Sequence, residues 1–395
     1  MTTSSQKKRQ ARAICVPFLV SEYDEMITDH LLFRASLDHK INVFPELFPA
    51  NTASGYKLKD LRYSKKMGFS VRRIEVNGIN YTIRPSFVMP YMTGMVSDVQ
   101  DPLFLRKFNV PFWALAHVFG RDAMYWYRME QSLGRNNLVG TTIKNPENIP
   151  QDLGADEKHS HIQGEKAYIA TTVGDHCILG VSITTDAGEK SLTNAYGKFK
   201  DEVQCLHPEY SPRTVNTDGW QGTQNAWKTL FPYIVLIGCF LHVYIKIRDR
   251  SKKKYKDIFC QVADKLWNCY NVTTKGAFSQ RVRRLHEWVK KIDAPDVMIK
   301  PIEKLRLNIK AFSNAYDFQG SLRTSNMIDR LMQRMDHHLF STQYFHGTVD
   351  SAELNIRVWA LINNFAPSNP LTVKKYDGLQ SPAERINRFR YHKVG

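Results

Sequence analysis

Residues 212–250 read PRTVNTDGWQGTQNAWKTLFPYIVLIGCFLHVYIKIRDR and predict a strand, a helix and a second strand. The first strand, residues 214–217, is rich in β-branched side chains and stops at Asp218-Gly219. The helix covers residues 221–230, and the apolar run at 233–237 is typical of a central parallel strand. Since open α/β sheets bind ligands beyond the carboxyl ends of their strands, Asp218 is a candidate functional residue. A purely structural role is the alternative, because Asp-Gly is a common turn pair.

The composition indicates a globular protein with two or three domains. The chain has 395 residues, of which 43% are hydrophobic and 12% aromatic. No apolar run approaches the length of a membrane span, and the polar, basic first 12 residues do not resemble a secretory signal. The six cysteines show no regular spacing, which favours reduced thiols and a cytoplasmic protein.

Positive charge is the strongest compositional signal. The formal net charge is +17, which suits a polyanionic partner, most commonly nucleic acid; a merely soluble basic surface is the alternative. Residues 241–310 hold 18 lysines and arginines against 7 aspartates and glutamates. Apolar residues at helical spacing predict a basic helical insertion at 251–320. Its candidate DNA contacts are Lys252, Lys253, Lys254, Arg281, Arg283 and Arg284.

The sequence predicts an N-terminal DNA-binding region of α+β type at residues 1–145. Alternating strands around Asn77-Gly78 predict a β-hairpin at 69–84. Two short helices around Gly120 predict a helix-turn-helix at 109–138, although any helical hairpin has a similar pattern. The predicted DNA contacts there are Arg121, Arg128 and Arg135. Residues 141–154, rich in proline and asparagine, are the predicted linker, and residues 371–395 are expected to form a loosely ordered basic tail.

The order of elements after this linker predicts one particular α/β fold. Strands near 156, 166–173 and 177–184 precede a helix at 190–206, and the strand-helix-strand unit follows. Three antiparallel strands, a helix, a parallel strand, a helix and a parallel strand are the order of the ribonuclease H-like fold, with a mixed five-stranded sheet. We therefore expect a catalytic domain formed by residues 146–250 and 321–370, interrupted by the helical insertion.

Over roughly residues 100–370 the chain resembles DDE/D transposases of the bacterial or archaeal insertion-sequence type. Asp156, in Ala-Asp-Glu-Lys, matches the first catalytic acid of that family, and Asp218 matches the second. Cys239-Phe-Leu-His242 resembles the Cys-x-x-His of Mutator-like transposases. The segment Thr-Ser-Asn-Met-Ile-Asp ending at Asp329 resembles the one that carries the third acid, with Asp in place of the commoner Glu.

This resemblance implies a metal-dependent enzyme acting on DNA. Two Mg²⁺ (or Mn²⁺) ions would serve in-line displacement at phosphorus, with Asp156 bridging them and Asp218 and Asp329 each holding one. The activity would be hydrolysis to a 3′-OH and then strand transfer. The partners would be the double-stranded DNA of the element ends and target, bound by a homodimer or larger homo-oligomer associated with the nucleoid.

Several alternatives stay open. The protein could be a regulator that uses only the helix-turn-helix, or a ribonuclease H-like nuclease without transposition. Asp336, two helical turns after Asp329, is the reserve third acid, or else an ion-pair partner of Arg330 or Arg334. Glu157 should point to the opposite face of its strand from Asp156.

The Cys-x-x-His segment has its own alternatives. A structural zinc site using His159, His161, Cys239 and His242 is disfavoured, because only one tight ligand pair is present. We expect Cys239 to pack in the core. His242 would support the active site, or be a core histidine with satisfied hydrogen bonds.

Overall fold

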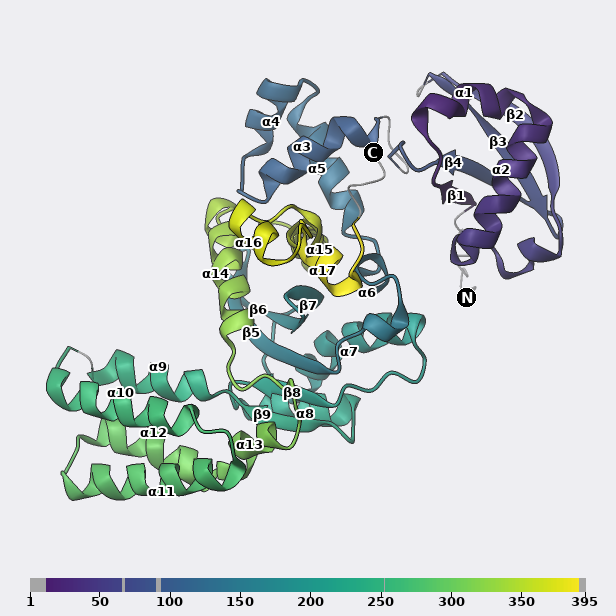
Figure 1. Ribbon diagram of the computed structural model, residues 1–395. Helices are drawn as coiled ribbons and strands as arrows, with labels where there is room; N and C mark the ends of the chain where they lie inside the picture. The colour runs from purple at the N-terminus through teal and green to yellow at the C-terminus, as the bar shows by residue number, and fades with distance from the viewer. Residues whose placement is uncertain (1–11, 66–67, 90–93, 252, 391–395) are drawn as a thin grey trace, which may run out of the picture. The chain divides into compact units, whose positions relative to one another are not determined.

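The computed structural model describes residues 12–65, 68–89, 94–251 and 253–390. The chain forms two compact units, Met1–Leu103 and Phe104–Gly395, and Figure 1 draws their helices and strands. Among the described residues, no helix has both the length and the hydrophobicity that crossing a membrane would need.

The first unit is a four-stranded sheet with helices and its own core. Its strand order is β1 (Ala13–Val16), β4 (Ile79–Pro85), β3 (Phe69–Val76) and β2 (Lys57–Ser64). The helices are α1 (Val20–Thr28) and α2 (His30–Val43), followed by the short 3₁₀ helices η1 (Pro45–Leu47) and η2 (Ala50–Ser54). The predicted β-hairpin is confirmed: Val76 pairs with Ile79 around Asn77 and Gly78, which both have the positive φ that a tight hairpin turn requires.

The second unit contains a five-stranded mixed sheet, which confirms the predicted α/β class. Its order is β7 (Cys177–Thr184), β6 (Glu165–Gly174), β5 (Asp152–Ile162), β8 (Thr214–Thr217) and β9 (Val235–Gly238). β5, β6 and β7 are antiparallel, whereas β8 runs parallel to β5 and β9 parallel to β8. The helices α7 (Glu189–Leu206) and α8 (Gln221–Leu230) cover one face of this sheet. The other face is covered by α14 (Asn326–Ser341) and α15 (Val349–Phe365).

A bundle of helices is inserted between β9 and α14, as the sequence predicts for residues 251–320 (Figure 1). It comprises α10 (Lys256–Tyr270), α11 (Lys275–Lys291), α12 (Asp296–Leu307), α13 (Ile309–Ser313) and the 3₁₀ helix η4 (Asn314–Tyr316). These helices share a core that contains Leu266, Val282 and Ile302. The preceding helix α9 (Phe240–Ser251) contributes Val243 and Ile247 to the same core, so the bundle begins earlier than predicted.

Residues 104–145 belong to the second unit, whereas the sequence grouped them with the N-terminal region. This part contains the end of α3 (Val96–Arg106), then α4 (Phe112–Phe119), α5 (Ala123–Leu133) and α6 (Leu138–Thr142); the 3₁₀ helix η3 (Pro146–Asn148) follows it. Arg357 of α15 donates hydrogen bonds to the carbonyl oxygens of Gly134 (3.0 Å) and Asn136 (2.7 Å). Ile143 and Ile149 are buried in the core under the sheet, so the predicted linker does not separate the two units.

The prediction of a loosely ordered basic tail at residues 371–395 is wrong for the described residues, because residues 370–390 pack on the second unit. They form α16 (Pro370–Lys375) and α17 (Pro382–Asn387). Ser381 and Glu384 make a capping box at the start of α17, and Ile386 joins the core of the sheet. The basic composition suggested a solvated extension, but the capping box and the burial of Ile386 attach this segment to the second unit. Residues 391–395 lie outside the described part of the chain.

Candidate active site

Two acids end up side by side because two neighbouring strands are parallel and in register. Gly154 of β5 pairs with Asn216 of β8, so Asp156 on β5 and Asp218 just after β8 each stand two residues beyond this pair. β8 ends at Thr217. Asp218 also forms the turn, since its Oδ1 accepts a 2.7 Å hydrogen bond from the N–H of Trp220. The turn role and a functional role are therefore compatible.

The third acid arrives from the far side of the helical insertion. Residues 322–325 cross the ends of the strands: the Asn216 side chain donates to the Leu322 carbonyl (2.9 Å), and the Phe240 N–H donates to that of Arg323 (3.1 Å). Helix α14 then starts and carries Asp329 in its first turn. Asp156, Asp329 and His242 each offer one ligand atom, and these atoms lie within 4.8 Å of one another. Among the described residues this is the one such group of three or more acidic, histidine or cysteine ligands.

Cys239 holds the third acid in place through a serine. The Cys239 side chain is 2% exposed, which confirms its predicted place in the core. Its thiol donates to the Ser325 hydroxyl (3.1 Å), and that hydroxyl donates to Asp329 Oδ2 (2.6 Å). Burial raises the pKa of the Cys239 thiol, which keeps its proton available for this bond. Ser325 does begin α14, but its side chain makes no capping bond because the hydroxyl is committed to Asp329.

His242 is not a core histidine with satisfied hydrogen bonds. It lies in the first turn of α9, three residues after Cys239. Its Nδ1 atom is buried and has no hydrogen-bond partner among the described residues. A buried nitrogen without a partner is costly, unless a proton donor or a metal ion satisfies it. This observation favours the predicted role of His242 in supporting the site.

Negative charge is concentrated at this point of the sheet. Burial first, and then nearby negative charges, raise the pKa of the Asp156 carboxyl to about 7. Those charges belong to Glu157, Asp218 and Asp329. Glu157 faces away from Asp156, as predicted, and accepts hydrogen bonds from Tyr196 and Thr223, each 2.6 Å long. Asp218, although outside the close group of three, is thus near enough to act on Asp156.

The donor set suits a divalent cation. Two carboxylates and a neutral imidazole would give a hard cation oxygen ligands together with one nitrogen, and the positive charge would offset the repulsion between the acids. Carboxylates suit both Mg²⁺ and Mn²⁺, whereas imidazole is a better ligand for transition metals than for Mg²⁺. The identity of the ion and the number of ions stay predictions.

A cavity of about 220 Å³ borders one of the three acids, Asp218, and was not foreseen from the sequence. Asp218 and His242 line it on the side of the sheet. On the side of the helical bundle it is lined by Lys246 of α9 and by Lys304 and Asn308 of α12 and its end. Two lysines therefore line the same cavity as Asp218 and His242, which is an arrangement suited to an anionic group.

The reserve acid has a different partner from those predicted. Asp336 forms an ion pair with Lys158 (2.6 Å), not with Arg330 or Arg334. Lys158 is two residues after Asp156 on β5, and therefore on the same face of the sheet. Asp329 and Asp336 are both on α14 and approach residues of the same strand, β5. It is Asp329 that reaches the group containing Asp156 and His242.

Two of the three histidines of the disfavoured zinc site, His159 and His161, contact aromatic rings. His159 contacts the rings of Tyr168 (4.9 Å between centroids) and Trp220 (6.5 Å), and His161 contacts Tyr344 (5.2 Å). Neither histidine belongs to the group of ligands that includes His242.

The structure describes most of the predicted DNA contacts. On the helix pair α4 and α5, Arg121, Arg128 and Arg135 are all exposed. In the helical bundle, Lys253 and Lys254 are exposed, and Lys252 lies outside the described residues. Arg283 pairs with Glu287 (3.7 Å), while Arg281 and Arg284 line a separate pocket. Whether any of them binds DNA stays a prediction.

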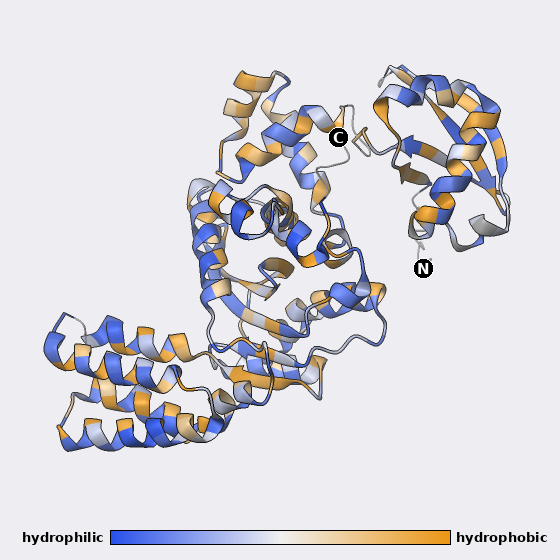
Figure 2. Ribbon diagram, in the orientation of Figure 1, coloured by the Kyte–Doolittle hydropathy of each residue, from blue (hydrophilic) through white to orange (hydrophobic). Residues whose placement is uncertain are grey.

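The two predicted helices around Gly120 are confirmed as α4 and α5. However, α4 leaves large apolar side chains exposed, which is unusual for the first helix of a compact helix pair. Figure 2 shows α4 as largely hydrophobic, and yet Trp113 (69%) and Val118 (67%) are exposed. A hydrophobic surface therefore lies next to the helix that was predicted to contact DNA.

Comparison with known proteins does not add a family. No family model matches the chain, and no curated protein matches it at a significant level.

Proposed function

We propose that this protein is a DNA transposase that cuts and joins DNA strands at element ends by metal-dependent phosphoryl transfer. The strand order, with three antiparallel strands followed by two parallel ones beside the first, supports a ribonuclease H-like fold for the catalytic part. The observation that carries the proposal is the meeting of Asp156, His242 and Asp329 within 4.8 Å, beside Asp218. These residues come from three distant segments of the chain, and each segment carries one of the sequence motifs.

Each group has a role that follows from its surroundings. Asp156, Asp329 and His242 would hold a divalent cation, and Asp218 would complete the set from the neighbouring strand end. When bound, such cations neutralise the charge of a phosphodiester and activate the attacking oxygen. Ser325 orients Asp329 through its 2.6 Å hydrogen bond. Lys246 and Lys304, at the edge of the adjoining cavity, would bind phosphates next to the cut.

The partner in this proposal is double-stranded DNA, bound by a homodimer or a larger homo-oligomer. The chain carries a formal net charge of +17, and much of the excess lies in the helical bundle beside the acids. Phosphate neutralisation by such a surface would make DNA binding strong and dependent on salt concentration.

The test uses the full-length protein and duplexes taken from the DNA that flanks its gene. With Mg²⁺ or Mn²⁺, we expect cleavage at a 3′ end followed by joining of that end to a second duplex. Asp156→Asn, Asp218→Asn and Asp329→Asn should abolish cleavage and keep DNA binding, since binding depends on the basic surface. Cleavage that survives all three substitutions would overturn the proposal. Cleavage without joining would instead support a nuclease.

A further inference from the structure

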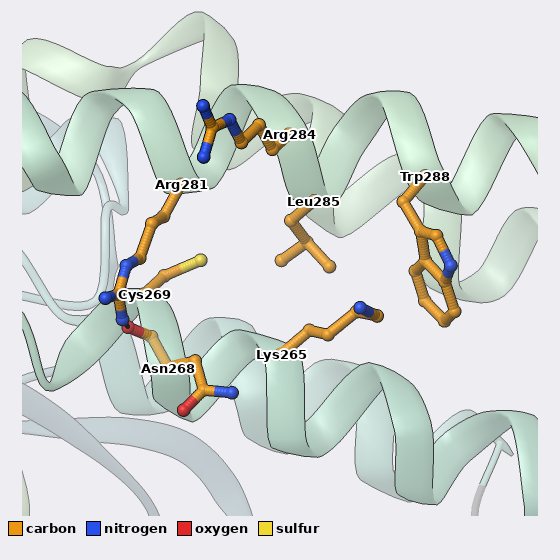
Figure 3. Close-up of a pocket in the computed structure, with 7 residues that line it drawn as sticks. All are labelled: Lys265, Asn268, Cys269, Arg281, Arg284, Leu285 and Trp288. Atoms are coloured by element: carbon orange, nitrogen blue, oxygen red, sulfur yellow. Dashed lines mark hydrogen bonds between the residues drawn. The ribbon is translucent and has the colours of Figure 1, made fainter.

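A second pocket lies in the helical bundle, between α10 and α11 (Figure 3). Its volume is about 390 Å³. Helix α10 contributes Lys265, Asn268 and Cys269, which are spaced three and four residues apart and so share one side of that helix. The opposite wall belongs to α11 and consists of Arg281, Arg284, Leu285 and Trp288.

The pocket gathers three positive charges that have no acidic partner. Among the described residues, no carboxylate forms an ion pair with Lys265, Arg281 or Arg284. Cations on the same helix differ: Arg283 pairs with Glu287 (3.7 Å), and Lys290 pairs with Glu303 (3.6 Å). The three charges of the pocket thus have no acidic partner, whereas Arg283 and Lys290 outside it are each paired with a glutamate.

Two of these cations are also held in position. Arg281 donates a 2.6 Å hydrogen bond to the carbonyl oxygen of Asn268, which spans the two helices. The Lys265 ammonium lies 4.6 Å from the centre of the Trp288 ring, in a cation–π contact that Figure 3 shows across the pocket. Partly ordered cations lose less conformational entropy when they bind an anion than free side chains would.

The remaining residues that line the pocket add no negative charge that would compete with a bound anion. Burial raises the pKa of the Cys269 thiol to about 11, so at neutral pH the free thiol keeps its proton and adds no negative charge to the pocket. Leu285 adds an apolar wall. Guanidinium groups match the oxygens of a phosphate with two parallel hydrogen bonds, which an ammonium cannot do alone.

We infer that Lys265, Arg281 and Arg284 form a discrete site for a backbone phosphate of nucleic acid. The inference rests on the proposed function in taking DNA as the source of that phosphate, since free phosphate shares the chemistry. In the run Arg281-Val-Arg-Arg, the first and last arginines line the pocket, whereas Arg283 does not line it and pairs with Glu287.

The experiment measures the affinity of the full-length protein for a fluorescent DNA duplex over a series of salt concentrations, with EDTA to prevent cleavage. The variant R281Q/R284Q is compared with K290Q/K291Q, which removes the same charge from the same helix. We expect the pocket variant to lose about tenfold or more in affinity at low salt, and its log–log salt slope to fall by about 2. The control should lose no more than about threefold. R281K/R284K, which keeps the charge, should recover part of the loss.

Two results would overturn the site. Equal losses in the pocket and control variants would mean that the charges act as a diffuse surface. If inorganic phosphate raised the melting temperature of the wild type but not of R281Q/R284Q, while both bound DNA equally, the pocket would serve free phosphate. Failure of the proposed function is distinct: the pocket effect on DNA affinity would remain, but addition of Mg²⁺ or Mn²⁺ would produce no cleavage.

Discussion

At the scale of single residues, the centre of the site is a carboxyl group that is unfavourably placed without a cation. The pKa of Asp156 is raised from its ordinary value of 3.8 to about 7, first by burial and then by neighbouring charges. A raised carboxyl pKa means that the folded state prefers the protonated form. The protein therefore loses stability as pH rises from about 4 to about 7, because over that range the unfolded chain releases this proton more readily.

Asp156→Asn should remove this penalty. Without divalent ions at pH 8, we expect the free energy of unfolding of the variant to exceed that of the wild type by about 2 kcal/mol. A pKa shift of about three units sets the upper limit of this difference at about 4 kcal/mol. Near pH 4 the difference should vanish. Urea unfolding at both pH values in EDTA measures the effect. A variant equally destabilised at both would show that Asp156 has a structural role instead.

His242 should determine which ion the site prefers. Its Nδ1 atom is buried without a partner among the described residues, and one of its ring nitrogens lies within 4.8 Å of carboxylate oxygens of Asp156 and Asp329. Imidazole binds Mn²⁺ better than it binds Mg²⁺. His242→Ala should lower the affinity for Mn²⁺ by about 10- to 100-fold and change that for Mg²⁺ much less. Calorimetric titration with each ion measures both. His159→Ala is the matched control, and equal losses for the two ions would show that His242 is not a ligand.

At the scale of elements, the position of α14 along β5 selects the third acid. Asp329 meets Asp156 and His242, whereas Asp336 pairs with Lys158. In the cleavage assay, Asp329→Asn should lose at least about 100-fold in rate. Asp336→Asn should stay within a few-fold of the wild type and cost no more than about 1 kcal/mol of stability, since its ion pair is partly exposed. The reverse pattern would mean that the helix is shifted by two turns in the active protein.

The elements that the sequence predicts well are those whose pattern is local. The hairpin around Asn77-Gly78 and the helices of the bundle follow from short-range turn and spacing signals. The proximity of Asp218 to Asp156 was also within reach, because parallel neighbouring strands align their carboxyl ends.

What the sequence did not reveal depends on contacts between distant segments. The role of Ser325 requires Cys239 beside it, and nothing near either residue indicates that contact. The partner of Asp336 lies on β5, so helical spacing alone pointed to the wrong residues, Arg330 and Arg334. Residues 104–145 were assigned to the N-terminal region because their attachment to α15 has no local signature.

At the scale of the whole molecule, the division of the chain near residue 103 changes which fragment can stand alone. Helix α5 and the turn after it depend on α15, and a side chain at Gly134 would collide with the backbone of Leu354. In a fragment of residues 1–145 we expect the amides of 104–145 to exchange freely with solvent, whereas in the full chain they should be protected. Residues 12–65 and 68–89 should be protected in both, since they have their own core. Hydrogen exchange measures this; protection of 104–145 in the fragment would contradict the division.

The central claim is that three distant segments of the chain build one metal site for phosphoryl transfer. The most direct measurement is anomalous scattering from crystals of the full-length protein grown with Mn²⁺. The account predicts a peak among the side chains of Asp156, Asp329 and His242, with Asp218 beside it. In crystals of Asp329→Asn the peak should weaken or disappear. A wild-type map that has no peak at these residues, or whose Mn²⁺ lies elsewhere, would contradict the account.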